Sequence, residues 1–490
     1  MPEAPLAAVP VRRWPILAAC LMATFMPAVE STIVATAMPT IVADLGGFAL
    51  FSWAFTLYLL TQAVSIPLYG RLADLHGRKP VFFAGAGLFL AGSVLAGFAH
   101  GMVALILFRA VQGLGAGGVM PVAATILGDI YAPAERARVQ GLVSSVFGVS
   151  AVIGPSLGAF LIEHLSWPVV FWVNLPIGAA SLVMLGLFLR ERVAPRPHRL
   201  DIAGSVLLFT AIGGLMLVLV QGAALPGLAW WGAFGCGIAA MVALLVHETR
   251  IAEPMLPLEL WRDPVIVAGS LGNCATGAVM MGVAAFLPAY VQGAMGRSPG
   301  AGGLVLGAMS VSWALASLLA GRIMLRTSYR STARLGGAAL VMGCLMLVAL
   351  TPARGPLWAG AGSFVIGLGM GFCSTTFIVS IQAAVPWAKR GAATSSAMFL
   401  RFVGQALGAA GCGAVLNATL REGGGVANEP LANRVLDGAQ RARLPPGELA
   451  RMVTLLAHGL HNAYLLAAAL SVVALALAWL IPRRLSPRHA

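Results

Sequence analysis

The sequence is short of charged residues. Of its 490 residues only 10% are Asp, Glu, Lys or Arg, whereas 59% are hydrophobic. A soluble chain of this length carries about a quarter charged residues, because its surface must face water. The shortage excludes a water-soluble globular protein and indicates that the outer surface of the folded chain faces lipid.

Three further scarcities exclude classes of function. The two lysines, Lys79 and Lys389, lie in no G-x-x-x-x-G-K-[ST] loop of the kind that cradles phosphate, which argues against an ATP-driven pump. The aspartates are scattered, so the clustered set that a metal-dependent prenyl transferase needs is missing. The six cysteines lie singly in apolar segments, without disulfide or zinc spacing. We therefore expect no metal, no cofactor and no enzymatic activity.

The formal net charge is +14, which raises the question of nucleic acid as a partner. The basic residues occupy short gaps between apolar runs, and no basic stripe with interleaved aromatic residues is present. Such an excess is typical of the cytoplasmic loops of membrane proteins. We expect no nucleic-acid partner.

Fourteen apolar segments are long enough to cross a bilayer core, which takes about 20 helical residues. The first follows Arg12 and Arg13 and resembles a signal peptide, but it continues without a small-residue cleavage site, so we expect it to be retained. The predicted fold class is all-α, a polytopic membrane protein with fourteen transmembrane helices. Their approximate ranges are 14–36, 51–70, 80–99, 102–127, 139–162, 168–189, 201–221, 229–247, 265–291, 300–321, 334–351, 356–384, 392–416 and 462–481.

The basic residues test this map, since cytoplasmic loops hold most of the Lys and Arg of a membrane protein. With the N-terminus inside, the cytoplasmic segments hold 22 of the 31 basic residues. The short external loops hold Arg297 and Arg354, and a long external loop, 417–461, holds five more. With an odd number of spans, the basic residues would no longer fall mainly in the loops on one side of the membrane. We expect an even number of spans and both termini in the cytoplasm.

One carboxylate lies deep inside a predicted span. Among the 17 acidic residues only Glu30 falls well within an apolar segment. An ionisable group inside a span is energetically costly, so its presence there suggests a function. Counting 1.5 Å per residue places Glu30 roughly 24 Å from the cytoplasmic edge and Arg109 roughly 10 Å from the external edge. These depths allow a direct or water-mediated interaction if the two spans adjoin.

We assign Glu30 the role of proton or cation acceptor, protonated in one access state and ionised in the other, with Arg109 as its partner in proton coupling. Burial disfavours the ionised carboxylate, whereas the arginine favours it. Two alternatives stay open. Glu30 could face a solvated external vestibule without any coupling role, and Arg109 could be a purely structural tether between helices.

The loop after the second span reads GRLADLHGRKP (residues 70–80), in which two glycines bracket a tight turn and Asp74 lies among cations. The string resembles the signature loop of the major facilitator superfamily, G-x-L-A-D-x-x-G-R-[KR]. The resemblance implies a cytoplasmic charge cluster that holds the two halves of the protein together in the outward-open state. A solvated surface cluster is the alternative. The residues of this conformational switch are Gly70, Asp74, Gly77, Arg78 and Asp129.

Further segments extend the resemblance over essentially the whole chain. LILFRAVQGLGAG in span four is similar to the second motif of the superfamily, with Arg109 and Gln112 at matching places. VESTIVATAMP in span one resembles the D-x-T-V-V-N-V-A-L-P element of the fourteen-helix drug:proton antiporter branch, with Glu30 in place of Asp and Ala35 in place of Asn. WPVVFWVNLPIG and FLRFVGQALGAA resemble other elements of that branch.

Span five carries small residues and a proline. GPSLGAFL resembles the antiporter motif G-P-x-x-G-G through Gly154, Pro155 and Gly158, although Ala159 replaces the final glycine. Proline removes a backbone donor and bends a helix, and small residues four apart let helix backbones pack closely. We expect span five to be bent and to form a tightly packed seam that prevents leakage between the two halves. Ordinary membrane helix packing is the alternative.

The resemblance implies two six-helix bundles, 1–192 and 264–490, with two additional helices in 193–263 and the external loop 417–461 in the second bundle. It implies a proton-coupled antiporter of the bacterial cytoplasmic (inner) membrane that exports small lipophilic or cationic compounds, as in multidrug efflux and antibiotic resistance. The expected partners are a small-molecule substrate, protons and membrane lipids. The alternatives are an exporter of a lipid or siderophore-like metabolite, a nutrient symporter and a membrane-embedded transferase.

We expect the substrate to bind near the bilayer midplane, between the halves, as in carriers built from repeats. Aromatic, amide and basic residues in the spans are candidates to line that cavity, although such residues more often serve packing. Arg401, roughly 14 Å into span thirteen, could face the cavity or pair with backbone carbonyls. The candidates are Trp53, Tyr58, Gln62, Gln112, Asn174, Asn273 and Arg401.

Overall fold

A computed structural model describes residues 13–131, 133–191, 201–222, 225–251, 258–386, 390–422, 428–436 and 438–482. Within these ranges the chain is helical and contains no strand. Fourteen of its helical segments are long and apolar enough to cross a membrane. In lipid every backbone N–H and C=O must be satisfied within its own segment, which a helix does. The prediction of an all-α polytopic membrane protein with fourteen spans is confirmed.

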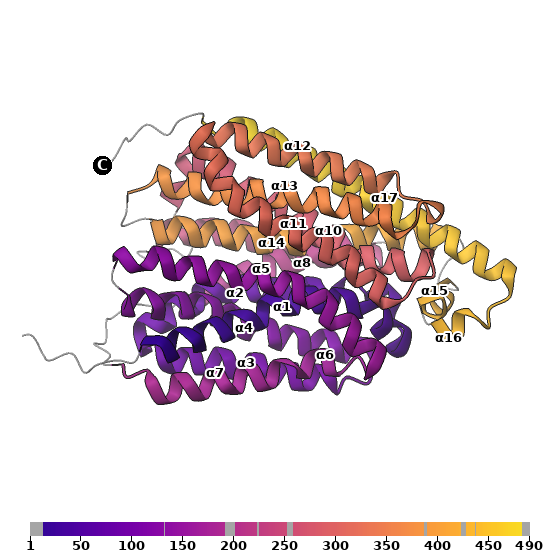
Figure 1. Ribbon diagram of the computed structural model, residues 1–490, viewed down its shortest axis with the longest axis horizontal. Coiled ribbons are helices and arrows are strands. Elements are labelled where there is room, and N and C mark those ends of the chain that lie inside the picture. The colour runs from indigo at the N-terminus through magenta and orange to yellow at the C-terminus, as the bar shows by residue number, and fades with distance from the viewer. Residues whose placement is uncertain are drawn as a thin grey trace, which may run out of the picture.

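The helices fall into three groups along the chain (Figure 1). The N-terminal half contains α1 (Arg13–Leu45), η1 (Phe48–Leu50), α2 (Trp53–His76), α3 (Arg78–Gly97), α4 (Met102–Ile130), α5 (Pro133–His164), α6 (Val169–Trp172) and α7 (Asn174–Phe188). The additional pair is α8 (Ile202–Gln221) and α9 (Gly227–Arg250), followed by η2 (Leu258–Arg262). The C-terminal half contains α10 (Pro264–Ala289), the π-helical turn η3 (Tyr290–Ala294), α11 (Pro299–Arg326), α12 (Tyr329–Val348), η4 (Pro352–Arg354), α13 (Gly355–Ala384), α14 (Arg390–Glu422), α15 (Asn428–Leu436), α16 (Gly438–Arg441) and α17 (Pro446–Leu480).

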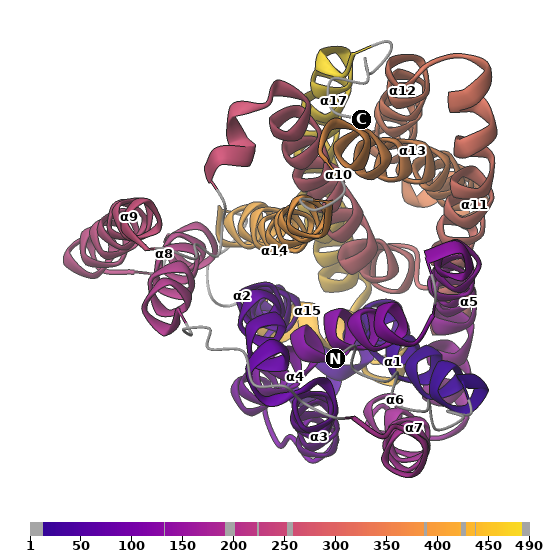
Figure 2. The same cartoon turned by 90° about the vertical axis from the view of Figure 1, so that its left-hand side faces the viewer.

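The two halves repeat one packing pattern. In the N-terminal half α4 packs on α2 and α3, and α1 packs on α5 and α7. In the C-terminal half α13 packs on α11 and α12, and α10 packs on α14 and α17. The halves meet through α5 with α11 and through α2 with α14, which are equivalent pairs in the repeat. Helices α8 and α9 lie to one side, where α8 contacts α2 and α14 (Figure 2).

The two ends of the bundle differ. The end at which α1 begins and α17 ends is named here the basic end, and the opposite end, where α15 lies, the α15 end (Figure 1). Among the described residues, three hydrogen bonds join the halves at the α15 end. Gln292 Nε2 donates to the Thr36 carbonyl at 3.3 Å, and Asn417 Nδ2 donates to the Ala49 carbonyl at 2.8 Å. The backbone N–H of Gly300 donates to Glu163 Oε1 at 2.9 Å.

Much of the segment 417–461, expected to be a long external loop, is helical. Helix α14 continues to Glu422, and α17 begins at Pro446, well before the predicted start of the last span at 462. Hydropathy marks only the part of a helix that lies in lipid, whereas backbone hydrogen bonding carries a helix on into water. Between these two helices α15 packs on α1 and η1, so this segment reaches across to the N-terminal half.

Candidate functional site

A buried ion pair lies inside the N-terminal half. Glu30 of α1 is 0% exposed and Arg109 of α4 is 1% exposed. Arg109 Nη1 lies 2.5 Å from Glu30 Oε1. The alternative in which Glu30 faces a solvated vestibule does not hold for this conformation, because water does not reach the carboxylate. Removing one member of a buried pair leaves an uncompensated charge, so the two groups depend on each other.

Two buried amide side chains contact the pair, and a buried serine supports one of them. Asn174 Nδ2, at the start of α7, donates to Glu30 Oε2 at 2.6 Å. Gln112 Oε1 accepts a hydrogen bond from Arg109 Nη1 at 2.7 Å, and its amide nitrogen donates to Ser93 Oγ of α3 at 2.8 Å. All five residues are 1% exposed or less. The cluster therefore ties together α1, α3, α4 and α7.

Helix α2 supports the arginine from the other side. The guanidinium of Arg109 lies 4.0 Å from the centre of the Tyr58 ring, and Nε donates to the Ala54 carbonyl at 3.3 Å. A cation over an aromatic face in a desolvated site is worth about 2 kcal/mol. Gly113 permits this approach, because a Cβ there would collide with the Tyr58 carbonyl oxygen. The glycine of this motif thus serves the close packing of α2 and α4.

The predicted cavity residues separate into two sets. Tyr58, Gln112 and Asn174 belong to the Glu30–Arg109 cluster rather than to a separate cavity. Among the others, Gln62 is 2% exposed on α2, and Asn273 is 1% exposed on α10, where its Nδ2 donates to the Gly269 carbonyl. Trp53 is half-buried at the first residue of α2.

Arg401 lies on α14 in the C-terminal half and is half-buried. Its guanidinium carbon lies 5.1 Å from the centre of the Trp313 ring of α11, and Nη2 lies 4.0 Å from the sulfur of Met280. An arginine inside a span is costly unless it faces a partner or water. Within the described residues its guanidinium thus contacts an aromatic ring and a thioether, and no backbone carbonyl accepts a hydrogen bond from it.

The loop between α2 and α3 turns at Gly77, whose φ of 91° is readily reached only by glycine. The expectation that Gly70 brackets this turn is wrong, because α2 continues to His76 and Gly70 lies inside it. Arg78 begins α3, and its Nε lies 3.0 Å from Asp129 Oδ2 at the end of α4. The side chain of Asp74 lies outside the described residues.

Glu191, which follows α7, is a member of this charge cluster that the sequence did not single out. Its two oxygens accept from the backbone N–H groups of Arg78 and Lys79, both at 2.8 Å. A carboxylate there satisfies free N–H groups of a helix start and complements its dipole. Lys79 Nζ donates in turn to the carbonyls of Gly186 and Leu189. The available signal was one acid inside the basic run after span six.

The small residues of α5 pack against two different helices. A Cβ at Gly154 would collide with Thr32 Oγ1, and one at Gly158 would lie 2.9 Å from Ile33 Cγ1, both on α1 of the same half. Toward the other half, a Cβ at Gly303 of α11 would lie 2.7 Å from the Pro155 carbonyl. The glycines therefore fit α5 to α1, whereas the backbone at Pro155 meets the C-terminal half.

Two alanine substitutions in α5 test this packing. Gly154→Ala should destabilise the protein by about 1–3 kcal/mol, because the added methyl overpacks the contact with α1. Gly148→Ala is the matched control, since its Cβ would meet only Ala314 Cβ, at 3.4 Å. Thermal unfolding in detergent should show a lower Tm for Gly154→Ala alone. Equal Tm values for the two variants would contradict the assigned seam.

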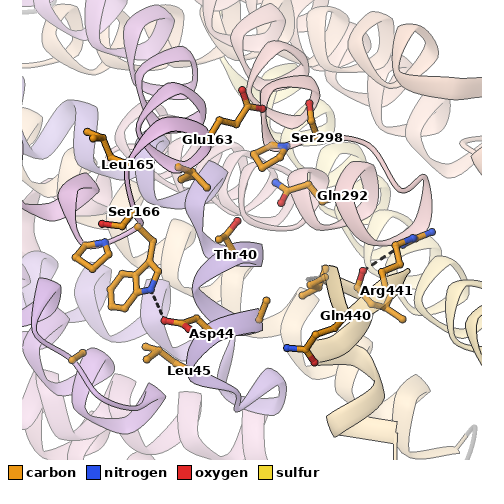
Figure 3. A pocket seen from close by; sticks show the side chains of 18 of the residues that line it. Thr40, Asp44, Leu45, Glu163, Leu165, Ser166, Gln292, Ser298, Gln440 and Arg441 are labelled. Atoms are coloured by element: carbon orange, nitrogen blue, oxygen red, sulfur yellow. Dashed lines mark hydrogen bonds between the residues drawn. The ribbon is translucent and has the colours of Figure 1, made fainter. Parts of the chain in front are cut away.

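A pocket of about 1150 Å³ lies at the α15 end, between the halves (Figure 3). Thr40 and Asp44 of α1, Glu163 of α5 and Gln292 of η3 line it, together with Arg441 of α16. The guanidinium of Arg441 donates to the Gly293 carbonyl, and its burial lowers its pKa. Residues of both α15 and α16 therefore form part of the wall at this end.

The repeated packing of the two halves is the architecture of secondary transporters that are built from repeats. The chain belongs to the major facilitator superfamily, whose family model matches residues 20–409. It is 33% identical over 412 residues to Multidrug transporter protein MdtP of Bacillus subtilis (strain 168), covering 83% of this chain and 76% of that protein. It is 33% identical over 391 residues to Multidrug resistance protein 3 of the same organism, covering 79% and 76%.

Among solved structures, a bacterial homolog of the human lysosomal transporter Spinster, in an inward-facing and unoccupied conformation, superposes with a TM-score of 0.66. The identity is 18%, and the match covers 97% of this chain and 98% of that one. At this identity the likeness concerns the fold, which is that of the superfamily. The predicted family membership and fold are confirmed.

Proposed function

We propose that this chain is a proton-coupled antiporter that exports small lipophilic or cationic compounds by alternating access. The observation that carries the proposal is the Glu30–Arg109 pair, an ionisable pair without solvent contact inside one half of the bundle. The C-terminal half has no acid well inside its spans, so the proposed coupling is confined to the N-terminal half.

Protonation of Glu30 is the proposed switching step. The ionised carboxylate accepts from both Arg109 and Asn174, so it holds α1 to α4 and α7. A proton on the carboxyl group removes the counter-charge of Arg109, and a buried unpaired cation is strongly unfavourable. The arginine must then find other partners or water, which requires α1 and α4 to shift. A two-state bundle moves toward whichever state binds the proton better.

The direction of transport and the location rest on further arguments. The basic end is proposed to be cytoplasmic, because basic loops remain on that side. Both termini are then proposed to be cytoplasmic, and the membrane is proposed to be the bacterial cytoplasmic (inner) membrane. Two bacterial relatives carry multidrug transporter or resistance names, which supports export of lipophilic compounds.

Arg401, beside Trp313 and Met280, is proposed to line the substrate path in the C-terminal half.

Transport into sealed vesicles tests the proposal. Purified protein in liposomes with an acidic lumen should accumulate a lipophilic monocation such as tetraphenylphosphonium while the lumen becomes more alkaline. Protein-free liposomes provide the control for passive partition of the cation. Uptake without any change of lumenal pH, or uptake accompanied by further acidification, would contradict proton antiport.

The single deep acid sets an expected limit on substrate charge. One carboxylate can compensate one positive charge, so a neutral or monocationic compound should be exported better than a dication of similar size. The two compounds compared are tetraphenylphosphonium and a bis-triphenylphosphonium alkane. Their initial rates of uptake are measured in the same vesicles and divided by the fraction of each compound that binds to the vesicles. Equal rates for the dication would count against this limit, although they would not count against proton coupling.

A further inference from the structure

A groove on the outer surface of the C-terminal half lies apart from the site described above. It has a volume of about 420 Å³ and runs between the beginning of α12 and the end of α17, at the basic end. One wall carries the Ser331 hydroxyl and the Arg334 guanidinium, and the rest is largely apolar. Its lining residues are Ser331, Arg334, Leu335, Ala338, Leu475 and Trp479.

Arg334 supplies a cation with free hydrogen-bond donors. Its guanidinium carbon lies 3.5 Å from the centre of the Trp479 ring, so the group is stacked on the aromatic face. Stacking uses the π face of the guanidinium and leaves its in-plane N–H donors for another partner. Within the described part of the chain, no carboxylate or carbonyl oxygen is hydrogen-bonded to Arg334. The cation is therefore available to a ligand.

The remainder of the groove suits a hydrocarbon chain. Leu335 is 48% exposed and Trp479 is 52% exposed on the outer surface of the spans, where the solvent is lipid. The floor is closed because Gly337 brings α12 against Leu475. Arg330 Nε donates to the Ile481 carbonyl at 2.7 Å, which fixes the end of α17 to α12. The walls of the groove are thus held together without a ligand.

We infer that this groove binds one phospholipid with an anionic headgroup. The phosphate and headgroup lie against Arg334 and the Ser331 hydroxyl, and one acyl chain follows Leu335 and Leu475. Three properties agree with such a ligand. Tryptophan concentrates at the headgroup level of membranes, basic pockets between spans bind anionic headgroups, and the first turn of α12 attracts negative charge. The inference stands independently of the proposed transport activity.

Retention of lipid by the purified full-length chain tests the inference. The protein is incubated in detergent with equal amounts of phosphatidylglycerol and phosphatidylcholine, and bound lipids are counted by native mass spectrometry. The wild type should retain one phosphatidylglycerol in preference to phosphatidylcholine. Arg334→Ala should lower that retention about fivefold, the effect of one basic residue at a membrane surface. Arg334→Lys, which keeps the charge, should retain most of it.

The matched control is Arg326→Ala, which removes an exposed arginine at the same end of the bundle but outside the groove. It should retain lipid as the wild type does. Should Arg334→Ala fail to fold, Arg334→Gln removes the charge with a side chain that still forms hydrogen bonds. Equal retention by Arg334→Ala and Arg326→Ala, or no preference of the wild type for phosphatidylglycerol, would overturn the inference.

Discussion

Replacing Glu30 with glutamine is expected to abolish export driven by a proton gradient. Glutamine has nearly the same shape, and its carbonyl oxygen can still accept from Arg109, but it cannot bind and release a proton. The pH-gradient-driven component of uptake into liposomes should fall at least about tenfold, the effect of 1.4 kcal/mol on a rate. Binding of a neutral lipophilic compound in detergent should persist, because such a compound does not need the carboxylate to compensate a positive charge.

The control for this experiment is Glu135→Gln. Glu135 is an exposed carboxylate whose Oε2 lies 3.2 Å from Arg13 Nη1, with side chains about half exposed. Surface pairs of this kind contribute about 0–1 kcal/mol, so transport by this variant should match the wild type. Full proton-driven exchange by Glu30→Gln would remove Glu30 from the mechanism.

Replacing Arg109 with glutamine should have the larger effect on stability. The substitution leaves Glu30 buried without its cation and removes the contacts with Gln112, the Ala54 carbonyl and the Tyr58 ring. Breaking a buried pair in this way costs about 3–5 kcal/mol. Thermal unfolding in detergent should show a clear drop in Tm. Arg109→Lys should recover little of it, because a lysine ammonium cannot reproduce the planar fork and its stacking.

A double variant separates structural tethering from coupling. Glu30→Gln combined with Arg109→Gln removes both buried charges, so it should regain much of the lost Tm. It should remain inactive in proton-driven uptake, since the site has lost the carboxylate that binds and releases the proton. If the double variant regained transport together with stability, Arg109 would be a tether between helices and the proposed coupling would be wrong.

Much of this architecture follows from the sequence because lipid imposes a simple rule. A span needs a long apolar run, and the alternation of basic loops fixes the parity of the spans. The same rule makes a lone acid in a span visible, which is why Glu30 could be selected without a structure. Arg109 could be matched to it, because depth along a helix follows from residue count.

Other parts of the site depend on helix rotation and tilt, which residue counts do not give. Asn174 was predicted to line a cavity, yet α7 turns it toward Glu30. Ser93 was missed because nothing in the sequence indicates which face of α3 meets α4. Glu191 was missed because its partners are backbone N–H groups of a distant helix start. The end of α14 and the start of α17 were not located, because the polar ends of helices give little hydropathy signal.

The central claim is that the charge state of Glu30 selects which side of the bundle is open. The most direct test measures the distance between spin labels at His76 and Arg326, which are exposed at the basic ends of α2 and α11. Cys236 is exposed and Cys274 half-buried, so both are replaced first. In the wild type the distance distribution should shift as the pH is lowered, and in Glu30→Gln it should stay fixed. A pH-dependent shift of equal size in Glu30→Gln would contradict the claim.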